Sequence, residues 1–488
     1  MSYIHGFSQN MQETIEKFKF DKQIDKLKDG NLLYLIIERF NKVDLSLEAV
    51  SNHDMGYIFE ELIRKFSEMS NETAGEHYTP REIIQLMVNI IILGDEKILK
   101  TPFIIRSVYD PACGTGGMLT IAKDTILEKL NSKAEIQLFG QEINDVTYAV
   151  AKSDMLIKGE NADNIKGGDN DHSKSSTLSN DQFRESKFDY ILSNPPYGVD
   201  WKKDQAKVEE EALRGYAGRF GAGTPRISDG QLLFLQHMIS KMKPTTDGGS
   251  KIALVFNGSP LFTGDAGSGE SEIRRWVLEN DRLDTIIGLP DQLFYNTGIS
   301  TYIWILSNRK APAKKGKVKL IDARTYFKKM RKSLGNKRHE ISPDDIQKIC
   351  DLYKDDIENS QVKIFKTTDF AFRQITIERP LKDEKGNVVE DKKGVIKSDS
   401  ELRDTENVPY YMDVDEYFEK EVKPYVPDAW INKDKKYCDH KDNNVGKIGY
   451  EISFTRYFYT YQPPRALEEI ESDIEKVENE LLEMIKKL

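Results

Sequence analysis

Apolar positions near the start of the chain follow a helical spacing. In residues 55–66 they recur every three or four residues and predict one apolar helical face, formed by Ile58, Phe59, Leu62, Ile63 and Phe66. Residues 1–76 are therefore expected to be a helical N-terminal region, which ends near Gly75 and Pro80. The apolar run at 83–93 is predicted to be a buried helix, because it is too short to span a membrane.

Farther along, the pattern changes to short β-branched runs separated by helical or loop segments. The runs lie at residues 103–110, 136–143, 188–196, 251–258, 283–290 and 300–308. Strands that alternate with crossover helices are typical of an α/β fold with a mostly parallel sheet. We expect residues 77–310 to form one such domain.

The C-terminal part differs in its composition and in its pattern of apolar residues. Residues 311–450 are expected to form a basic and charged extension of mixed structure, within which 381–404 resembles an exposed hairpin or mobile insertion. Residues 451–488 end in a heptad pattern after Pro463-Pro464, carried by Leu467, Ile470, Ile474, Val477, Leu481, Met484 and Leu488. Such a stripe cannot bury itself alone, so it predicts packing against helices of this chain or of a partner.

The composition is that of a globular protein of two to four domains. The chain has 488 residues, of which 38% are hydrophobic and 31% charged. Its three cysteines, Cys113, Cys350 and Cys438, form neither a disulfide framework nor a metal-ligand spacing and indicate a reducing compartment. There is no secretory signal and no apolar run of membrane-spanning length, so we expect a cytoplasmic protein with no membrane partner.

The formal net charge is −10, which argues against nucleic-acid binding through overall charge. The charge is unevenly distributed, however. Residues 309–338 hold thirteen Lys or Arg and one acid, a local charge of +12, so the rest of the chain carries −22. This segment is either a solvated face or a local contact for DNA phosphates.

Three motifs carry candidate chemistry. The first, VYDPACGTGGML (108–119), stands between a predicted strand and a predicted helix. Its glycines allow a tight turn and close approach of the backbone to a ligand. Many turns without a ligand are rich in glycine, but Asp110 and Pro111 before the glycines make such a turn a less fitting interpretation of this motif. No Gly-Lys-Ser/Thr follows, so this is not a phosphate loop.

The second motif is FGQEIN (139–144), in which Glu142 ends the next predicted strand. An acid at this place can accept two hydrogen bonds from ribose hydroxyls. By itself a glutamate at a strand end is more often a solvated carboxylate. Its position downstream of the glycine-rich motif favours the ribose interpretation.

The third motif is FDYILSNPPYG (188–198), where an apolar strand runs into Asn194-Pro195-Pro196-Tyr197. The two prolines make a rigid loop without backbone donors. The Asn194 side-chain oxygen and the Pro195 carbonyl can accept hydrogen bonds from an amino group, and Tyr197 offers a flat face to a planar base. The loop therefore suits an exocyclic amino group that must become more nucleophilic without a strong base.

Together the motifs resemble those of the S-adenosylmethionine-dependent N6-adenine DNA methyltransferases, in the gamma order because GEHYTPREI (75–83) precedes both others. Longer strings at 218–244, 257–276, 289–306 and 445–470 resemble the modification subunit of type I restriction-modification systems. The resemblance covers about residues 50–488. It implies a Rossmann-like class I methyltransferase domain with a mostly parallel seven-stranded sheet and helices on both faces, plus a helical N-terminal region and a C-terminal helical tail.

The resemblance also assigns roles to single residues. S-adenosyl-L-methionine is the implied cofactor, and no metal is implied. The implied cofactor-binding residues are Glu76, His77, Tyr78, Thr79, Pro80 and Arg81 at its methionine end, Asp110, Gly114, Thr115, Gly116 and Gly117 in the loop, and Glu142 at the ribose. The residues implied to hold a flipped-out adenine are Asn194, Pro195, Pro196 and Tyr197.

The chain departs from the family pattern in two places. The family string that helps bind the cofactor adenine has two counterparts within 167–183: Asp169 fits by its Gly-Asp sequence, and Ser176-Thr177-Leu178 fits by distance to Asn194. Family members usually have a helical domain of well over a hundred residues before the first motif, whereas this chain has about 75. If the family pattern holds, we expect Met1 to begin a truncated or internally started protein.

The implied partners are double-stranded DNA, a separate specificity subunit that reads the target and contacts the C-terminal helix, and a restriction/translocase subunit, with two copies of this chain per specificity subunit. Three alternatives stay open. One is a self-contained N6-adenine methyltransferase with its own target-recognition region in 311–450. The others are a protein glutamine methyltransferase and a DNA-binding or scaffold subunit without methyl transfer.

Overall fold

A computed structural model describes residues 6–46, 48–50, 55, 58, 79–169, 171–295, 297–461 and 467–485 of the chain. The chain divides into two compact units, Met1–Ile452 and Ser453–Leu488.

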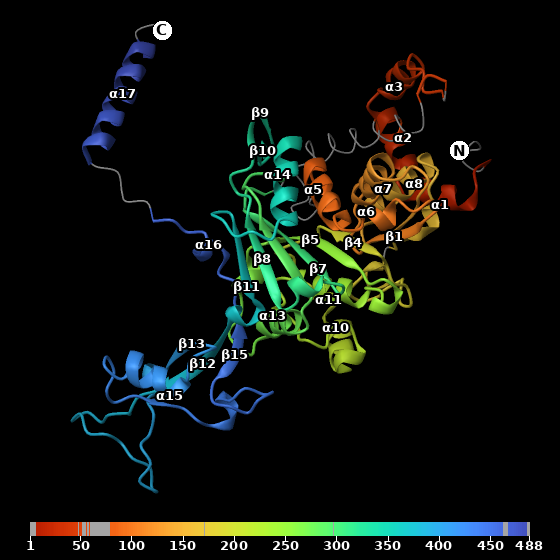
Figure 1. Cartoon of the computed structure of the whole chain (residues 1–488). Helices are drawn as coiled ribbons and strands as arrows, with labels where there is room; N and C mark the ends of the chain where they lie inside the picture. Colours follow the sequence, from red (N-terminus) through yellow and green to blue (C-terminus); the bar gives the residue numbers. More distant parts are fainter. Residues whose placement is uncertain are drawn as a thin grey trace. The chain divides into compact units, whose positions relative to one another are not determined.

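The larger unit is built on one mixed sheet. Among the described residues this sheet has nine strands, in the order β11-β8-β6-β7-β5-β4-β1-β2-β3 (Figure 1). Their bounds are β1 Ile105–Asp110, β2 Glu135–Glu142, β3 Ile165–Gly167, β4 Tyr190–Ser193, β5 Lys251–Asn257, β6 Leu283–Gly288, β7 Thr301–Ser307, β8 Lys317–Asp322 and β11 Val362–Lys366. The pairing is parallel from β3 to β5 and between β6 and β8, whereas β7 runs antiparallel to both neighbours.

The predicted strands are confirmed. All six β-branched runs form strands, namely β1, β2, β4, β5, β6 and β7, and every residue of β6 and β7 is buried, as expected for strands covered on both faces. The short β3 completes the expected seven strands. β8 and β11 come from the segment that the sequence assigns to the C-terminal extension, and they add two strands beyond β6.

Helices cover both faces of the sheet. On one face α5 (Arg81–Ile92), α7 (Gly117–Lys129) and α14 (Pro343–Lys354) pack around a core that includes Val108. The next residue of β1, Tyr109, points to the other face and contacts α11 (Gln231–Ser240), which packs with α13 (Gly269–Glu279). The buried helix predicted at 83–93 is confirmed as α5.

Local capping explains several helix starts. The Asn144 side chain accepts hydrogen bonds from the Val146 and Thr147 amides at the start of α8 (Asp145–Ile157). Ser342 caps α14, whose first residue is proline. Within the described residues the other short α-helices of this unit are α6 Glu96–Leu99, α9 His172–Ser175, α10 Gln205–Ala212, α12 Ser259–Phe262 and α15 Val414–Tyr417.

The described part of the N-terminal region is helical, as the sequence predicts. It contains α1 Gln9–Lys17, α2 Phe20–Asp29 and α3 Leu33–Phe40, and α1 packs against α8. The helix predicted at 55–66 lies outside the described residues, apart from Met55 and Ile58.

Two further strand pairings lie outside the main sheet, one of them between β8 and β11 in sequence. A hairpin pairs β9 (Lys328–Leu334) with β10 (Lys337–Glu340). The second sheet contains β12 Ala371–Glu378, β13 Asp404–Pro409, β14 Trp430–Ile431 and β15 Lys447–Tyr450. Within 381–404 the predicted exposed hairpin is present as two short antiparallel turns in succession, closed by the bridges Lys382↔Val388 and Glu390↔Ile396.

The smaller unit contains α16 (Phe454–Tyr457) and α17 (Leu467–Ile485), which confirms the predicted terminal helix. Its heptad positions are exposed: Leu467, Ile470, Ile474, Val477, Leu481 and Met484. No helix within the described ranges combines the length and the apolar character that crossing a bilayer requires.

Candidate functional site

The carboxyl ends of three neighbouring parallel strands bring the predicted motifs together. β1 ends at Asp110, β2 ends at Glu142, and β4 ends directly before Asn194. Ligands of open α/β sheets bind at this edge. A cavity of about 840 Å³ lies here, and the predicted residues that line it include Asp110, Gly114, Thr115, Gly117, Glu142, Asn194 and Pro196.

Two glycines shape the loop between β1 and α7. Gly114 (φ +54°) and Gly116 (φ +81°) lie in the left-handed region that L side chains rarely adopt. A Cβ atom on Gly114 would meet nothing within 4 Å, so conformation rather than crowding favours glycine there. The Gly116 amide donates to the Cys113 carbonyl at 2.8 Å, and α7 begins at the next residue. The backbone at Gly114 therefore faces open space, as close approach to a ligand requires, whereas a Cβ atom on Gly116 would lie 3.2 Å from Met155 and Gly116 does not line the cavity.

The Glu142 carboxylate is held in place by this loop. The Gly114 amide donates to its Oε2 at 2.9 Å, and the Asn144 amide donates to its Oε1 at 2.8 Å. Glu142 is only 9% exposed. A carboxylate can accept about four hydrogen bonds, so a fixed one at a cavity wall also suits the two hydroxyls of a ribose.

Asp110 joins the first motif to the third. Its Oδ1 accepts hydrogen bonds from the Ala112 amide at 2.9 Å and from Ser193 Oγ at 2.8 Å. Burial raises the pKa of Asp110 to about 7, although these two hydrogen bonds lower it, and the nearby Glu142 charge raises it further. Near neutral pH the side chain is therefore divided between its protonated and ionised forms.

Asn194 is oriented by a residue from a distant segment. Its Nδ2 donates to Thr79 Oγ1 at 3.0 Å, although the two residues are 115 positions apart. Both line the cavity, and Asn194 is 8% exposed. Because Thr79 engages the amide nitrogen, that end of the side chain is held and the amide oxygen is turned away from Thr79.

The other predicted residues occupy different places. Pro195 and Tyr197 are buried and do not line the cavity, and burial raises the pKa of the Tyr197 hydroxyl. Pro80 precedes α5 and Arg81 is its first residue, and neither lines the cavity. Three residues lie outside the described ranges: Glu76, His77 and Tyr78.

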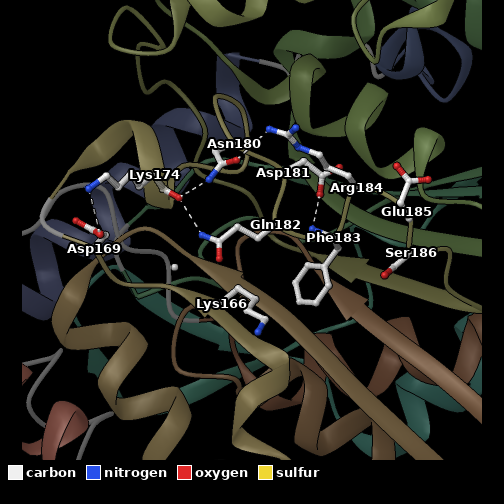
Figure 2. A pocket seen from close by; sticks show the side chains of 11 residues that line it. Lys166, Asp169, Lys174, Asn180, Asp181, Gln182, Phe183, Arg184, Glu185 and Ser186 are labelled. Carbon is white, nitrogen blue, oxygen red and sulfur yellow. Dashed lines mark hydrogen bonds and ion pairs between the residues drawn. The ribbon is translucent and has the colours of Figure 1, made fainter. Parts of the chain in front are cut away.

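The structure distinguishes the two counterparts within 167–183. Ser176, Thr177 and Leu178 line the cavity, and Thr177 Oγ1 donates to the Pro111 carbonyl at 2.6 Å. Asp169 instead lines a separate, more open pocket, where it lies 3.8 Å from the Lys174 ammonium (Figure 2). The Ser-Thr-Leu segment, not Asp169, therefore lies beside the glycine loop.

The sequence prediction missed the side chain that holds this segment. Arg219, between α10 and α11, donates to the Thr177 carbonyl at 2.7 Å and to the Leu178 carbonyl at 2.8 Å. Its guanidinium also pairs with both carboxylate oxygens of Glu211 and donates to His237 Nδ1 at 3.0 Å. An arginine in the glycine-rich string GRFGAG was the only signal, and the string does not identify its partners.

The loop after Tyr197 completes the cavity wall with residues that the sequence did not single out. Trp201 and Asp204 line the cavity, and Trp201 is 3% exposed. Asp204 accepts a hydrogen bond from Ser179 Oγ and lies 3.0 Å from His172 Nε2. These contacts join the loop to the segment that contains Thr177.

Comparison with known proteins agrees with this geometry. The model of the N-6 DNA Methylase family matches residues 50–382, well over half of the chain. The type I restriction enzyme MjaIX methylase subunit of Methanocaldococcus jannaschii is 28% identical over 324 residues, which cover 65% of this chain and 52% of that protein. The HindI methylase subunit of Haemophilus influenzae is 29% identical over 299 residues, covering 61% and 59%. The chain thus spans about half the length of the curated relatives it matches.

A solved structure is also similar to this chain. The crystal structure of the type I restriction-modification system methyltransferase subunit from Streptococcus thermophilus is similar with a TM-score of 0.56 and 27% identity, covering 70% of this chain and 65% of that chain. The fold is the expected Rossmann-like class I methyltransferase fold, with two strands added at one edge. The chain belongs to the N-6 DNA methylase family.

Proposed function

We propose that this chain is the modification subunit of a type I restriction-modification complex and transfers a methyl group from S-adenosyl-L-methionine to N6 of adenine in DNA. The observation that carries the proposal is the hydrogen bond between Asn194 and Thr79 in the same cavity as the glycine loop and Glu142. The oriented amide of Asn194 can accept a hydrogen bond from an amino group, and the fixed carboxylate of Glu142 can accept hydrogen bonds from the ribose of a nucleoside.

The residues of the cavity fit the cofactor. Glu142 would hold the ribose, the backbone at Gly114 would approach closely, and Thr177 and Leu178 would flank the adenine ring. The Thr79 segment would lie at the methionine end. When bound, S-adenosyl-L-methionine supplies an electrophilic methyl group on a positively charged sulfur.

The substrate base must leave the duplex before it can react, at a cost of a few kcal/mol. Asn194 would accept a hydrogen bond from N6 through its amide oxygen, and the Pro195 carbonyl would accept the second. Because Thr79 already fixes the amide, little reorganisation is needed at the moment of reaction. Stacking on Tyr197 would return about 1–3 kcal/mol. Tyr197 is 7% exposed, so the groups that cover its ring would have to move.

Cofactor affinity is expected to increase with pH through the titration of Asp110. The pKa of this buried side chain is raised to about 7, so its ionised form becomes dominant above that pH. A cationic cofactor stabilises the ionised form, so affinity should rise about tenfold between pH 6 and pH 8. Calorimetric titration with S-adenosyl-L-methionine at several pH values measures this.

The control is Asp110→Asn, which keeps the oxygen that accepts from Ala112 and Ser193 but cannot ionise in this range. Its affinity should be independent of pH over the same interval. An equal pH dependence in both proteins would contradict the role given to Asp110.

The proposed partners are a specificity subunit and a restriction subunit, with two copies of this chain per specificity subunit in the cytoplasm. The exposed heptad side chains of α17 support a helical partner, because an apolar stripe on one helix gains stability only when another helix covers it. DNA recognition would then belong to the partner, consistent with the net charge of −10.

Methylation assays with and without a co-expressed specificity subunit test the proposal. Transfer only with the partner supports a modification subunit. Transfer by the chain alone would identify a self-contained enzyme instead. Cofactor binding without transfer in either case would indicate a scaffold subunit and would overturn the proposed activity.

A further inference from the structure

The fold divides the cations of residues 309–338 into two sets. Six pair with carboxylates: Arg309, Lys310, Lys314, Lys319, Arg324 and Lys337. The other seven have no ion-pair partner in the part of the chain that the structure describes: Lys315, Lys317, Lys328, Lys329, Arg331, Lys332 and Arg338. Fewer cations are therefore available to bind an anion than the local charge of +12 indicates.

Five of the unpaired cations are on the β9–β10 hairpin. β9 contributes four exposed cations, Lys328, Lys329, Arg331 and Lys332, and β10 contributes Arg338. The only exposed acid within the two strands is Glu340, which stands opposite Lys328 in the pairing register. The hairpin is therefore a compact, net positive surface, whereas Lys315 and Lys317 stand apart from it.

Strand direction places the hairpin at the edge of the sheet that holds the cavity. β8 runs parallel to β6 and in the same direction as β4 and β5, because β7 is antiparallel to both of its neighbours. β8 therefore ends at the carboxyl edge, and the chain enters the hairpin after it (Figure 1). Lys315 and Lys317 lie at the start of β8, at the opposite edge.

A buried lysine attaches the hairpin to the site. Lys337 is 3% exposed, and its ammonium contacts the Glu82 carboxylate and the carbonyls of Leu293 (3.1 Å) and His339 (3.0 Å). Glu82 lies in the first turn of α5, three residues after Thr79. Three residues span at most about 11 Å, so the attachment point lies close to the residue that orients Asn194.

The turn of the hairpin is also fixed. The Asn336 amide donates to the Tyr295 carbonyl at 2.9 Å. Gly335 has φ +60°, and a Cβ atom there would lie 2.6 Å from the same carbonyl oxygen. The His339 amide donates to the Gln292 carbonyl at 3.1 Å. A charged run that serves only to solvate the surface needs neither a buried lysine nor such anchoring.

We propose that the β9–β10 hairpin binds backbone phosphates of duplex DNA next to the base that enters the cavity. This inference rests on the proposed function and adds a specific contact surface to it. Lysine and arginine on a fixed hairpin neutralise phosphates without reading bases, so the contact positions the duplex rather than selecting its sequence. The attachment through Glu82 sets the distance between bound phosphates and Asn194.

The test compares two variants of the full chain that each lose two exposed lysines. Lys328→Gln/Lys332→Gln changes the hairpin, and Lys315→Gln/Lys317→Gln changes the opposite edge of the sheet. Fluorescence anisotropy with a labelled duplex of unrelated sequence gives the dissociation constant from low to moderate salt. The slope of log affinity against log salt is negative, and each lost phosphate contact makes it shallower by about 0.9. The slope of the hairpin variant should therefore be shallower by nearly 2.

The control variant should keep the slope of the unmodified chain. Equal slopes in all three proteins, equal losses in both variants, or no binding of duplex even at low salt would overturn the inference. Cofactor binding and methyl transfer with the specificity subunit are measured in parallel. If these persist while the slopes are equal, only the hairpin contact is wrong, whereas their absence would count against the proposed function.

Discussion

Replacement of Asn194 by alanine is expected to lower the rate of methyl transfer at least about a thousandfold and to leave cofactor affinity within a few fold. Alanine removes the amide oxygen proposed to accept from N6, and it removes the group that Thr79 holds in place. The cofactor loop and Glu142 keep their own hydrogen bonds, which do not involve Asn194. The variant should therefore bind the cofactor and fail at the transfer step.

Single-turnover methylation and calorimetric cofactor binding separate these two effects. Asn180→Ala is a matched control, because Asn180 lines the open pocket of Figure 2 and not the cavity. It should transfer methyl groups at nearly the normal rate. Near-normal transfer by Asn194→Ala would refute the acceptor role, and lost cofactor binding would make Asn194 a structural residue.

Replacement of Arg219 by alanine is expected to destabilise the protein by about 2–3 kcal/mol, because a partly buried ion pair loses one partner and two carbonyls lose a donor. Burial alone would raise the pKa of Glu211, but hydrogen bonds and the charge of Arg219 hold it below its usual value. Without the guanidinium the Thr177 and Leu178 carbonyls lose this donor, and of the bonds from residue 219 to Glu211 only that of the backbone amide to Oε1 remains. Cofactor affinity should fall at least about tenfold, since each unmade hydrogen bond of a buried group costs about 1–3 kcal/mol.

Arg214→Ala provides the comparison. Arg214 pairs with Glu210 across one helical turn, and both side chains are more than half exposed. Such a pair contributes about 0.3–0.5 kcal/mol, so this variant should unfold and bind cofactor almost as the unmodified chain does. Denaturant unfolding measures the stability of both proteins. Similar losses in the two variants would mean that Arg219 does not support the cavity.

The network behind Arg219 reaches the sheet. Because a guanidinium only donates, His237 Nδ1 accepts from Arg219, and the ring proton is on Nε2, which faces the Tyr109 hydroxyl at 2.9 Å. Burial lowers the pKa of His237 well below its usual value, with the charge of Arg219 as the next cause, so the ring is neutral. The cavity wall is thus tied to β1 by side chains that never touch the cavity.

The central sheet and the meeting of the three motifs could be predicted from the sequence. Short β-branched runs identify strands that are buried on both faces, and the ends of neighbouring parallel strands share one edge. That reasoning places Asp110, Glu142 and Asn194 together, as the structure does. It also predicts α5, because its apolar run is longer than a strand.

Contacts between distant segments could not be predicted in this way. The sequence offered both Asp169 and the Ser-Thr-Leu segment, and the choice depends on Arg219, which lies 42 positions after Thr177. The charge of +12 at 309–338 did not reveal that six cations pair with acids, some of them far away, as Arg309 does with Asp95. Periodicity and charge describe each segment, whereas partners are set by the topology.

The hydrogen bond between Thr79 and Asn194 bears on how the protein forms during synthesis. Gly114 and Glu142, which are proposed to hold the cofactor, are only 28 positions apart. Thr79 precedes α5, and α5 packs against β5 and binds Lys337 through Glu82. Contacts of large sequence separation form late, because loop closure must precede them. A nascent chain on the ribosome can therefore join Gly114 to Glu142 soon after both are made, whereas α5 and the preceding Thr79 reach their final packing only after Lys337 has been synthesised.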